Sequence, residues 1–355
     1  MAATVLLIAL VPLAWIWLRR RGTDRRARLA ALTALTLFLT FDLVAFGAFT
    51  RLSDSGLGCP DWPGCYAQAS PLGARADIHE AQAALPSGPV TWSKAWIEMI
   101  HRYLAATVGT LIVVTALATW IERRHTPISP WWPTATLVWV VIQGLFGKYT
   151  VTLKLYPAVV TLHLLGGLVL LVLLARQREA YRPRALVLPG ALRSGVAVAL
   201  GLLWVQIALG GWVSTNYAVL ACSGFPLCNG RWWPQADFGA GFTFLRGLGV
   251  DAAGAPLPFD ALVAIHLAHR SFAAVVAAAL AGLAWALLRR GDAATRRWGR
   301  ALALLLALQL ATGLSNVVLG WPLPAALIHT AGAAALVLLL TLLWLRGGAR
   351  AAAGA

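Results

Sequence analysis

The sequence has 355 residues, of which 59% are hydrophobic and only 12% are charged, and its formal net charge is +16. A soluble chain of this composition would have too little polar surface to cover itself, so the composition excludes an ordinary soluble domain and indicates a lipid bilayer as the solvent. Most of the 29 Lys and Arg residues lie in alternate connections between apolar segments, which is typical of orientation in a membrane and argues against a nucleic-acid-binding face.

Apolar segments of about 20 residues, the length that crosses the hydrocarbon core, recur along the chain. A first, shorter stretch at 3–18 has no basic residues before it and no small-residue cleavage site, so we interpret it as an extra N-terminal helix and not as a signal peptide. The segments that follow predict eight membrane-spanning helices, near 29–50, 97–119, 131–150, 158–175, 192–214, 261–287, 298–319 and 325–345.

The arginines predict how these helices are oriented. If every segment spans the membrane, five basic groups fall on one side, which should be the cytoplasm. These groups lie at 19–28, 123–124, 176–193, 289–300 and 346–350. The opposite side receives the two long loops, 51–96 and 215–260. We therefore expect both loops to be extracytoplasmic.

Both long loops contain a pair of cysteines with the same spacing, Cys59 with Cys65 and Cys222 with Cys228. Repeated spacing in outward-facing loops indicates two short disulfides. A zinc site is the alternative, but zinc usually needs a closer Cys spacing and further ligands.

The chain also repeats itself. The cysteine pairs recur at an offset of 163 residues, and Gln143–Gly147 is echoed by Gln309–Gly313 at an offset of 166. Because an even number of helices separates equivalent points, the repeats are parallel. The sequence thus predicts an all-α integral membrane protein built from two pseudo-symmetric four-helix bundles, with an extra N-terminal helix. The predicted parts are the extra helix and basic loop at 1–27, an N-terminal half at 28–185 and a C-terminal half at 186–355.

Four of the seven histidines occupy equivalent places in the two repeats: His101, His163, His269 and His329. Each lies roughly 7–10 Å inside the outer boundary of the membrane at 1.5 Å per residue, a depth at which ionisable groups are costly and often functional. For any one of them, a histidine bonded to a neighbouring helix is the alternative. Two imidazoles from facing helices commonly hold a haem iron, whereas zinc or copper would need more ligands nearby. The repeated pairing therefore favours bis-histidine haem ligation in each half.

Charged residues accompany these histidines. Arg102 and Arg270 each follow one of them, and their guanidinium groups either pair with haem propionates or extend to the membrane surface without a ligand. Glu98 stands one helical turn before His101, and its repeat equivalent is His266. A carboxylate in apolar surroundings could exchange protons near a haem edge, while the alternative is a glutamate that caps the start of the helix.

Other polar residues lie deep in the predicted helices. Gln143, Gln206 and Gln309 each precede a glycine by four residues, and we expect their amides to form hydrogen bonds between close-packed helices. Asp42 belongs either to the same class or to a proton path.

Together these residues resemble the haem A synthase family, of the bacterial type with cysteine pairs in the outer loops. The resemblance covers about residues 30–345. It is carried by Thr50–Leu57 with Cys59–Pro63, by Glu98–Arg102, by His269–Arg270, and by His163 and His329.

The resemblance implies an oxidoreductase that converts the C8 methyl of haem O to a formyl group, by way of an alcohol and a hydrated aldehyde, and so makes haem A for terminal oxidases. It implies that His101 and His163 flank the substrate haem with Glu98 as acid/base, and that Arg102 contributes to that site. His269 and His329 would ligate a resident haem b, with Arg270 a candidate for its propionates.

The family resemblance also implies a place and partners. It implies a bacterial inner membrane, haem O synthase and terminal oxidase assembly factors as partners, membrane lipid around the chain, no nucleic acid, and an oligomeric state left open between monomer and homo-oligomer. Cys59–Cys65 and Cys222–Cys228 would be loop disulfides, either structural or redox-active. The family has eight helices, so the segment 3–18 would be a ninth.

Two other functions use some of the same features. A diheme membrane electron carrier of the cytochrome b type would have the same ligands but no need for the difference between Glu98 and His266. A transporter with parallel repeats would place its binding groups at the midplane on broken helices, whereas these histidines lie near one surface.

Overall fold

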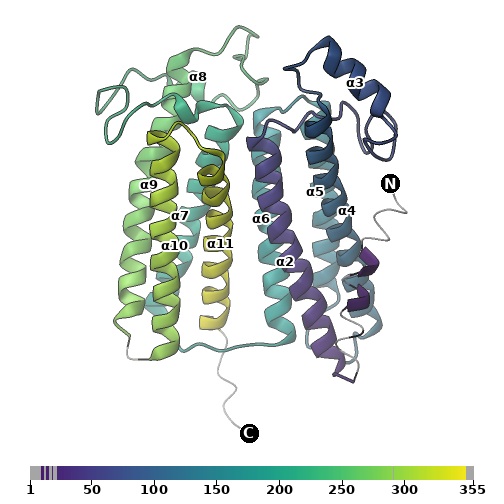
Figure 1. The fold of residues 1–355 in the computed structure, drawn as a ribbon. Helices are drawn as coiled ribbons and strands as arrows, with labels where there is room; N and C mark the ends of the chain where they lie inside the picture. The colour runs from purple at the N-terminus through teal and green to yellow at the C-terminus, as the bar shows by residue number, and fades with distance from the viewer. Residues whose placement is uncertain (1–8, 12, 16–17, 19–21, 291, 349–355) are drawn as a thin grey trace. The chain divides into compact units, whose positions relative to one another are not determined.

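The computed structural model describes the chain except residues 1–8, 12, 16–17, 19–21, 291 and 349–355 (Figure 1). The described part is helical, and β-structure within it is limited to isolated bridges in loops. The extra helix predicted over 3–18 falls largely outside the described residues.

Long helices occur where all eight later segments were predicted, which confirms the all-α membrane fold. They are α2 (Arg25–Leu52), α4 (Trp92–Ile121), α5 (Trp131–Thr152), α6 (Pro157–Tyr181), α7 (Gly190–Thr215), α9 (Phe259–Leu288), α10 (Ala293–Val318) and α11 (Leu323–Gly348). Shorter elements in the two long loops are α3 (Arg75–Ala84), η1 (Ala218–Leu220) and α8 (Phe238–Gly241).

Within the described residues, seven of these helices are long and apolar enough to cross a membrane, so the chain is a multi-pass membrane protein. Only α5 among the long helices falls outside this group, because Gln143, Lys148 and several threonines make it more polar. It nevertheless packs along α4 over its length of 22 residues, as the sequence predicts for a helix of the bundle.

Helices α2, α4 and α10 begin where a side chain accepts one of the first free backbone N–H groups. Asp24 caps α2 by accepting from Ala27 N–H, and Thr91 caps α4 by accepting from Lys94 N–H at 3.3 Å. Asp292 does the same for α10. These caps place the helix starts just before the apolar runs, as expected for Asp and Thr in this position.

The chain divides into two compact units. One comprises Met1–Leu155 and Gly166–Pro183, and the other comprises Tyr156–Leu165 and Arg184–Ala355. The division runs through α6, and the first turns of this helix, with His163, belong to the second unit. The predicted N-terminal half, 28–185, includes these turns.

In the first unit, α4 packs between α2 and α5. Val108 and Ile112 of α4 meet Leu170 and Leu174 of α6 in a buried apolar cluster. The amide of Gln143 on α5 lies directly against Gly166 of α6, where any Cβ would collide with it. Gln143 thus lies at a close helix–helix contact, but its Oε1 is buried without a hydrogen-bond partner, so the hydrogen bond predicted for this amide stays a prediction.

In the second unit, α7, α9, α10 and α11 pack in a closed ring, since α11 returns to α7. Gln206 of α7 donates to the carbonyl of His269 on α9 at 3.2 Å, and Gln309 of α10 donates to the carbonyl of His329 on α11 at 3.0 Å. The prediction that these amides join neighbouring helices is confirmed.

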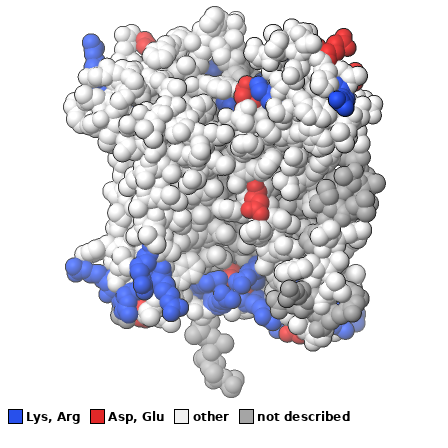
Figure 2. All heavy atoms as spheres, viewed as in Figure 1, with Lys and Arg blue, Asp and Glu red and all other residues white. Residues whose placement is uncertain are grey.

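The charge distribution agrees with the predicted orientation. In each unit, Figure 2 shows Lys and Arg gathered at the helix ends that lie opposite the disulfide loops. The basic turns include Arg123 and Arg124 after α4, and Arg289 and Arg290 after α9. The positive-inside rule predicts that these ends face the cytoplasm.

This orientation can be tested with reporters fused inside the loops. We expect alkaline phosphatase, which is active only outside the cytoplasm, to be active after Gly88 or Gly254 and inactive after Arg124 or Arg290. A fluorescent reporter that folds only in the cytoplasm should give the opposite pattern at the same four positions. Phosphatase activity after Arg124 would contradict the assignment.

Candidate functional site

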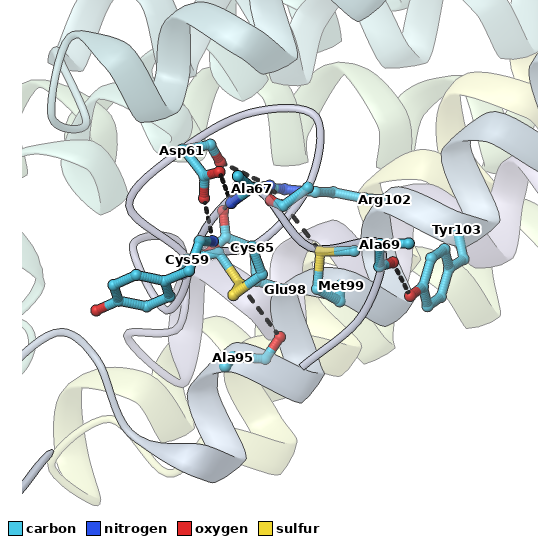
Figure 3. Close-up of a disulfide and its surroundings, with 12 residues drawn as sticks. Cys59, Asp61, Cys65, Ala67, Ala69, Ala95, Glu98, Met99, Arg102 and Tyr103 are labelled. Carbon is cyan, nitrogen blue, oxygen red and sulfur yellow. Dashed lines mark hydrogen bonds and ion pairs between the residues drawn. A yellow bond between two sulfur atoms is a disulfide. The ribbon is translucent and has the colours of Figure 1, made fainter. Parts of the chain in front are cut away.

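A disulfide-closed loop lies on the outer end of α4 (Figure 3). Cys59 and Cys65 form the disulfide, with both residues fully buried, so this predicted pairing is confirmed. The loop comes so close to α4 that a Cβ on Gly58 would collide with the Lys94 backbone. A tight backbone contact of this kind requires glycine.

Glu98 of α4 points into this loop and is only 3% exposed. Its Oε2 accepts a hydrogen bond from Cys59 N–H at 2.8 Å, and its Oε1 lies 2.5 Å from Arg102 Nη2 (Figure 3). Because Thr91 caps α4, Glu98 is not the cap of the helix start, and that alternative is wrong. The carboxylate instead joins the disulfide loop to the helix one turn before His101.

Arg102 completes the connection. Its Nη1 donates to the carbonyl of Asp61 at 2.8 Å and to the carbonyl of Gly64, while Nη2 pairs with Glu98. The side chain is 8% exposed, and these partners lie in the disulfide loop and on α4 itself. A planar guanidinium suits this role because it can serve several acceptors at fixed angles.

The second unit repeats the loop attachment. Cys222 and Cys228 form the second predicted disulfide. Arg270 donates to the carbonyls of Gly224 and Leu227 at 2.9 and 3.0 Å, and these positions correspond to Asp61 and Gly64 at the offset of 163. The ion pair is not repeated within the described residues, because His266 takes the place of Glu98. The arginine therefore fastens the loop in both units, and the buried carboxylate is specific to the first.

His101 packs closely against α2. An added Cβ on Gly47 would lie 2.9 Å from His101 Cε1, and the Phe46 ring stacks on the imidazole with centroids 6.4 Å apart. The glycine allows the ring to lie against the helix backbone. This contact fixes the side of α4 from which the imidazole projects.

The second unit contains two such contacts. A Cβ on Gly210 would lie 2.9 Å from His269 Cε1, and one on Gly313 would lie 3.1 Å from His329 Cε1. His269 on α9 and His329 on α11 thus each lie against a glycine of a neighbouring helix in the same bundle.

Hydrogen bonds orient these two rings. The Thr312 hydroxyl lies 3.0 Å from His329 Nδ1, and because it already donates to the Leu308 carbonyl, it accepts a hydrogen bond from the ring N–H. The Gln206 amide nitrogen lies 3.1 Å from His269 Nδ1 and 3.4 Å from its Nε2. At His329, where Nδ1–H donates to Thr312, Nε2 is left available as a ligand.

The donor set fits a haem. Among the described residues, no group of three or more His, Cys, Asp or Glu side chains could hold a metal ion. Two neutral imidazoles suffice when a porphyrin supplies the other four ligands of the iron. His269 and His329 therefore match an axial pair and do not match a mononuclear zinc site.

His163 lies on the part of α6 that belongs to the second unit. The Thr161 hydroxyl is 3.1 Å from that of Thr215 on α7, and a Cβ on Gly211 would lie 3.2 Å from Thr161 Cγ2. His163 Nδ1 is buried and has no hydrogen-bond partner. Sequence periodicity gave no sign that these turns pack on α7.

Sequence analysis also missed a buried arginine in the second long loop. Arg246 is 2% exposed, donates to Asn216 Oδ1 at 2.7 Å and stacks over Trp212. Burial lowers the pKa of its guanidinium. In the first loop, burial and the carboxylates of Asp77 and Asp61 raise the pKa of the Tyr66 phenol. Arg246 and Tyr66 each lie in an irregular loop, where no periodic pattern in the sequence indicates their surroundings.

The remaining candidates lie apart from these contacts. Asp42 is exposed on α2. His79 is exposed and stacks on Trp92, and His125 is exposed with its Nδ1 3.5 Å from Glu122.

Residues 30–341 match the family described as cytochrome oxidase assembly protein (COX15-CtaA). The chain is 39% identical to a haem A synthase of Shewanella oneidensis over 320 residues, which cover 88% of this chain and 94% of the relative. It is 29% identical to a haem A synthase of Caulobacter vibrioides, covering 90% and 96%, and 26% identical to one of Halalkalibacterium halodurans, covering 80% and 85%.

The two loop arginines should differ in how much they stabilise the protein. Arg102→Ala leaves Glu98 buried without its partner, so we expect a loss of about 3–5 kcal/mol in the free energy of unfolding. Arg270→Ala removes hydrogen bonds to carbonyls and a cation–π contact with Phe225 but leaves no buried charge unpaired, and should cost about 1–3 kcal/mol. Thermal unfolding of the purified protein in detergent measures both. Equal losses would contradict the assigned ion pair.

Proposed function

The chain belongs to the cytochrome oxidase assembly protein family COX15-CtaA, and from this premise we propose that it is a haem A synthase, an integral membrane oxidoreductase. The observation that carries this proposal is the 39% identity to the Shewanella oneidensis haem A synthase over 88% of the chain. The substrate would be haem O, and the reaction would oxidise its C8 methyl to the formyl of haem A.

His269 and His329 are the proposed axial ligands of a resident haem b. When bound, this haem would supply electron transfer. The chain's own contribution is to hold the two imidazoles: Gly210 and Gly313 allow the rings to lie against the helices, and Thr312 keeps Nδ1 of His329 engaged. Two-sided support of this kind restricts both the position and the rotation of a ligand ring.

His101 and His163 are the proposed histidines of the substrate site. Glu98 is the proposed acid/base because it is the buried carboxylate nearest to His101 along α4, one helical turn away. Arg102 and the Cys59 N–H hold both of its oxygens, so the carboxylate has a fixed position. A proton-handling group is efficient only when its position is fixed within hydrogen-bond reach of its partner.

Arg102 has a second possible consequence for the site. By joining Glu98 to the carbonyls of Asp61 and Gly64, it makes the position of the carboxylate depend on the disulfide loop. The disulfides would thus support the site by bracing the loops. Propionate contacts of Arg102 and Arg270 stay a prediction.

We further propose a bacterial inner-membrane location with both cysteine loops outside the cytoplasm. Haem O synthase would supply the substrate, and terminal oxidase assembly factors would receive the product. The mass of the purified protein in detergent tests whether the chain forms a homo-oligomer.

Glu98→Gln should stop turnover and leave the resident haem in place. The amide can still accept from Cys59 N–H but cannot take up and release a proton, so haem A formation from added haem O should fall by about 100-fold or more. Extracted haems, separated by chromatography, measure both the product and the resident haem.

Glu80→Gln is the matched control, because Glu80 is an exposed carboxylate on α3, in the long loop that precedes α4. If the Glu98→Gln variant forms haem A from haem O as fast as the unchanged protein, Glu98 is not the acid/base. Absence of haem A with the unchanged protein, under conditions that reduce and reoxidise its haem, would favour the diheme electron carrier.

His269→Ala and His329→Ala should each release the resident haem b. Each substitution removes one axial ligand and leaves a space beside Gly210 or Gly313 in its place. The ratio of haem to protein, from absorbance and haem extraction, measures this. His125→Ala, an exposed histidine near a helix end, should retain the haem. An unchanged ratio in both ligand variants would refute the assignment.

A further inference from the structure

The loop arginine of the second unit fixes the depth of its disulfide loop. Arg270 holds the carbonyls of Gly224 and Leu227, and it stands 19 residues before Arg289, the first basic residue after α9. At 1.5 Å per residue this separation is about 28 Å, close to the thickness of the hydrocarbon core. The loop that Arg270 holds therefore lies at the boundary of the hydrocarbon and not far above the membrane.

The first unit gives the same depth. Arg102 holds the carbonyls of Asp61 and Gly64, and it stands 21 residues before Arg123, the first basic residue after α4. This separation is about 32 Å, again one hydrocarbon thickness. Each disulfide loop thus meets the membrane surface of its own unit.

Each loop exposes an aromatic ring at the same place. Trp62 lies between the two carbonyls that Arg102 holds, and it is 41% exposed. Phe225, its repeat equivalent at the offset of 163, lies between the two carbonyls that Arg270 holds, and it is 60% exposed. The Arg270 guanidinium lies over the Phe225 ring, 5.8 Å from its centroid. Exposed aromatic rings at this depth are typical of the belts that membrane proteins place among lipid headgroups.

The second loop extends this apolar surface. Trp232 is 74% exposed and Trp233 is 70% exposed. The backbone of Arg231, directly before them, pairs with that of Cys228 through two hydrogen bonds of 2.9 and 3.0 Å, so Trp232 leaves the chain beside the disulfide. Arg231 is exposed and is the one charged residue in the sequence from 219 to 236. A single cation among exposed aromatic rings suits a lipid surface, where phosphates attract the cation and tryptophan is enriched.

We propose that the disulfide-closed loops are membrane-surface anchors, with Trp62 in the first unit and Phe225 and Trp232 in the second lying among the headgroups of the adjoining lipid leaflet. The disulfide and the loop arginine hold the backbone beneath the rings, so the rings keep this depth. The proposal needs only helices that span a membrane, and it does not rest on the proposed function.

Lipid is the occupant that the depth favours. A partner protein from water or a second copy of the chain could also cover exposed rings. These rings, however, continue the apolar surface of the spanning helices, as at Val275 of α9, which is 50% exposed. A ring at the hydrocarbon boundary on such a surface meets headgroups without any partner present.

A spin label measures this depth directly. All four cysteines of the sequence form disulfides, so an added cysteine is the single free thiol. The Trp232→Cys variant carries the nitroxide in vesicles of phosphatidylethanolamine and phosphatidylglycerol, with no other protein present. We expect its collisions with a water-soluble nickel chelate to be about 3-fold or more below those of a label on Ala253→Cys, and its collisions with oxygen, which concentrates in lipid, to be higher.

Two reference positions calibrate the measurement. Ala253 is exposed in a turn that precedes Phe259, the first residue of α9, and Phe259 lies roughly 16 Å outward of Arg270 along the helix. Ala253→Cys is therefore the aqueous reference. Val275→Cys, from the exposed face of α9, is the hydrocarbon reference.

Two outcomes of the spin-label test would overturn the proposal. Nickel access at position 232 equal to that at Ala253→Cys would show a ring in water, as expected for a surface that awaits a partner protein. Low access to both reagents, with spin–spin broadening between labels, would show a second copy of the chain at this surface.

The unchanged protein provides an independent test. A phospholipid with a photoreactive diazirine at the start of its acyl chain should label the peptides that contain Trp62, Phe225 and Trp232, and should leave the peptide with Ala253 unlabelled. Proteolysis and mass spectrometry locate the lipid and show whether both disulfides are intact. Labels confined to the spanning helices would contradict the proposal, and this result does not depend on the folding of any variant.

Discussion

Close approach of an imidazole to a glycine on the neighbouring helix is the constraint from which the sites of this protein follow. Such a contact is made by His101, His269 and His329. In each case a Cβ added to the glycine would lie 2.9–3.1 Å from Cε1 of the ring, which is closer than a normal van der Waals contact. Without a Cβ, two helices can pack at normal distance and still enclose a ring. The glycine therefore determines where the imidazole lies, and at His329 the Thr312 hydroxyl also fixes how the ring is turned.

The arginine that follows a histidine connects the helical turn carrying that histidine to a disulfide loop. In each unit it donates to two carbonyls of a disulfide-closed loop, and the carbonyls occupy equivalent positions in the repeat. The loop thus depends on the same helical turn that carries the histidine. Arg102 also pairs with Glu98, so in the first unit the loop attachment includes a buried ion pair. Loss of one partner would leave the other charge buried and unpaired, which strongly destabilises the folded protein.

Hydropathy and internal repetition predicted much of this structure, because both are properties of the chain alone. The eight long helices, the two disulfides and the amide contacts between helices agree with the sequence. The partners of Arg102 could not be predicted, since backbone carbonyls are present at every residue and only the folded loop selects two of them. The packing of the first turns of α6 on α7 was missed for a similar reason: a hydrophobic run shows that a helix is buried but not against which neighbour.

The differences between the halves carry more functional information than their likeness. Both units fasten a disulfide-closed loop through the arginine that follows a histidine, so the shared plan alone does not distinguish them. Glu98 against His266 gives the first unit a buried carboxylate paired with Arg102, and the second unit has an imidazole at the same position. Under the proposed function, a proton-handling group is needed only where the haem is chemically changed, so this one exchange of side chains assigns the reaction to the N-terminal half and the resident haem to the C-terminal half.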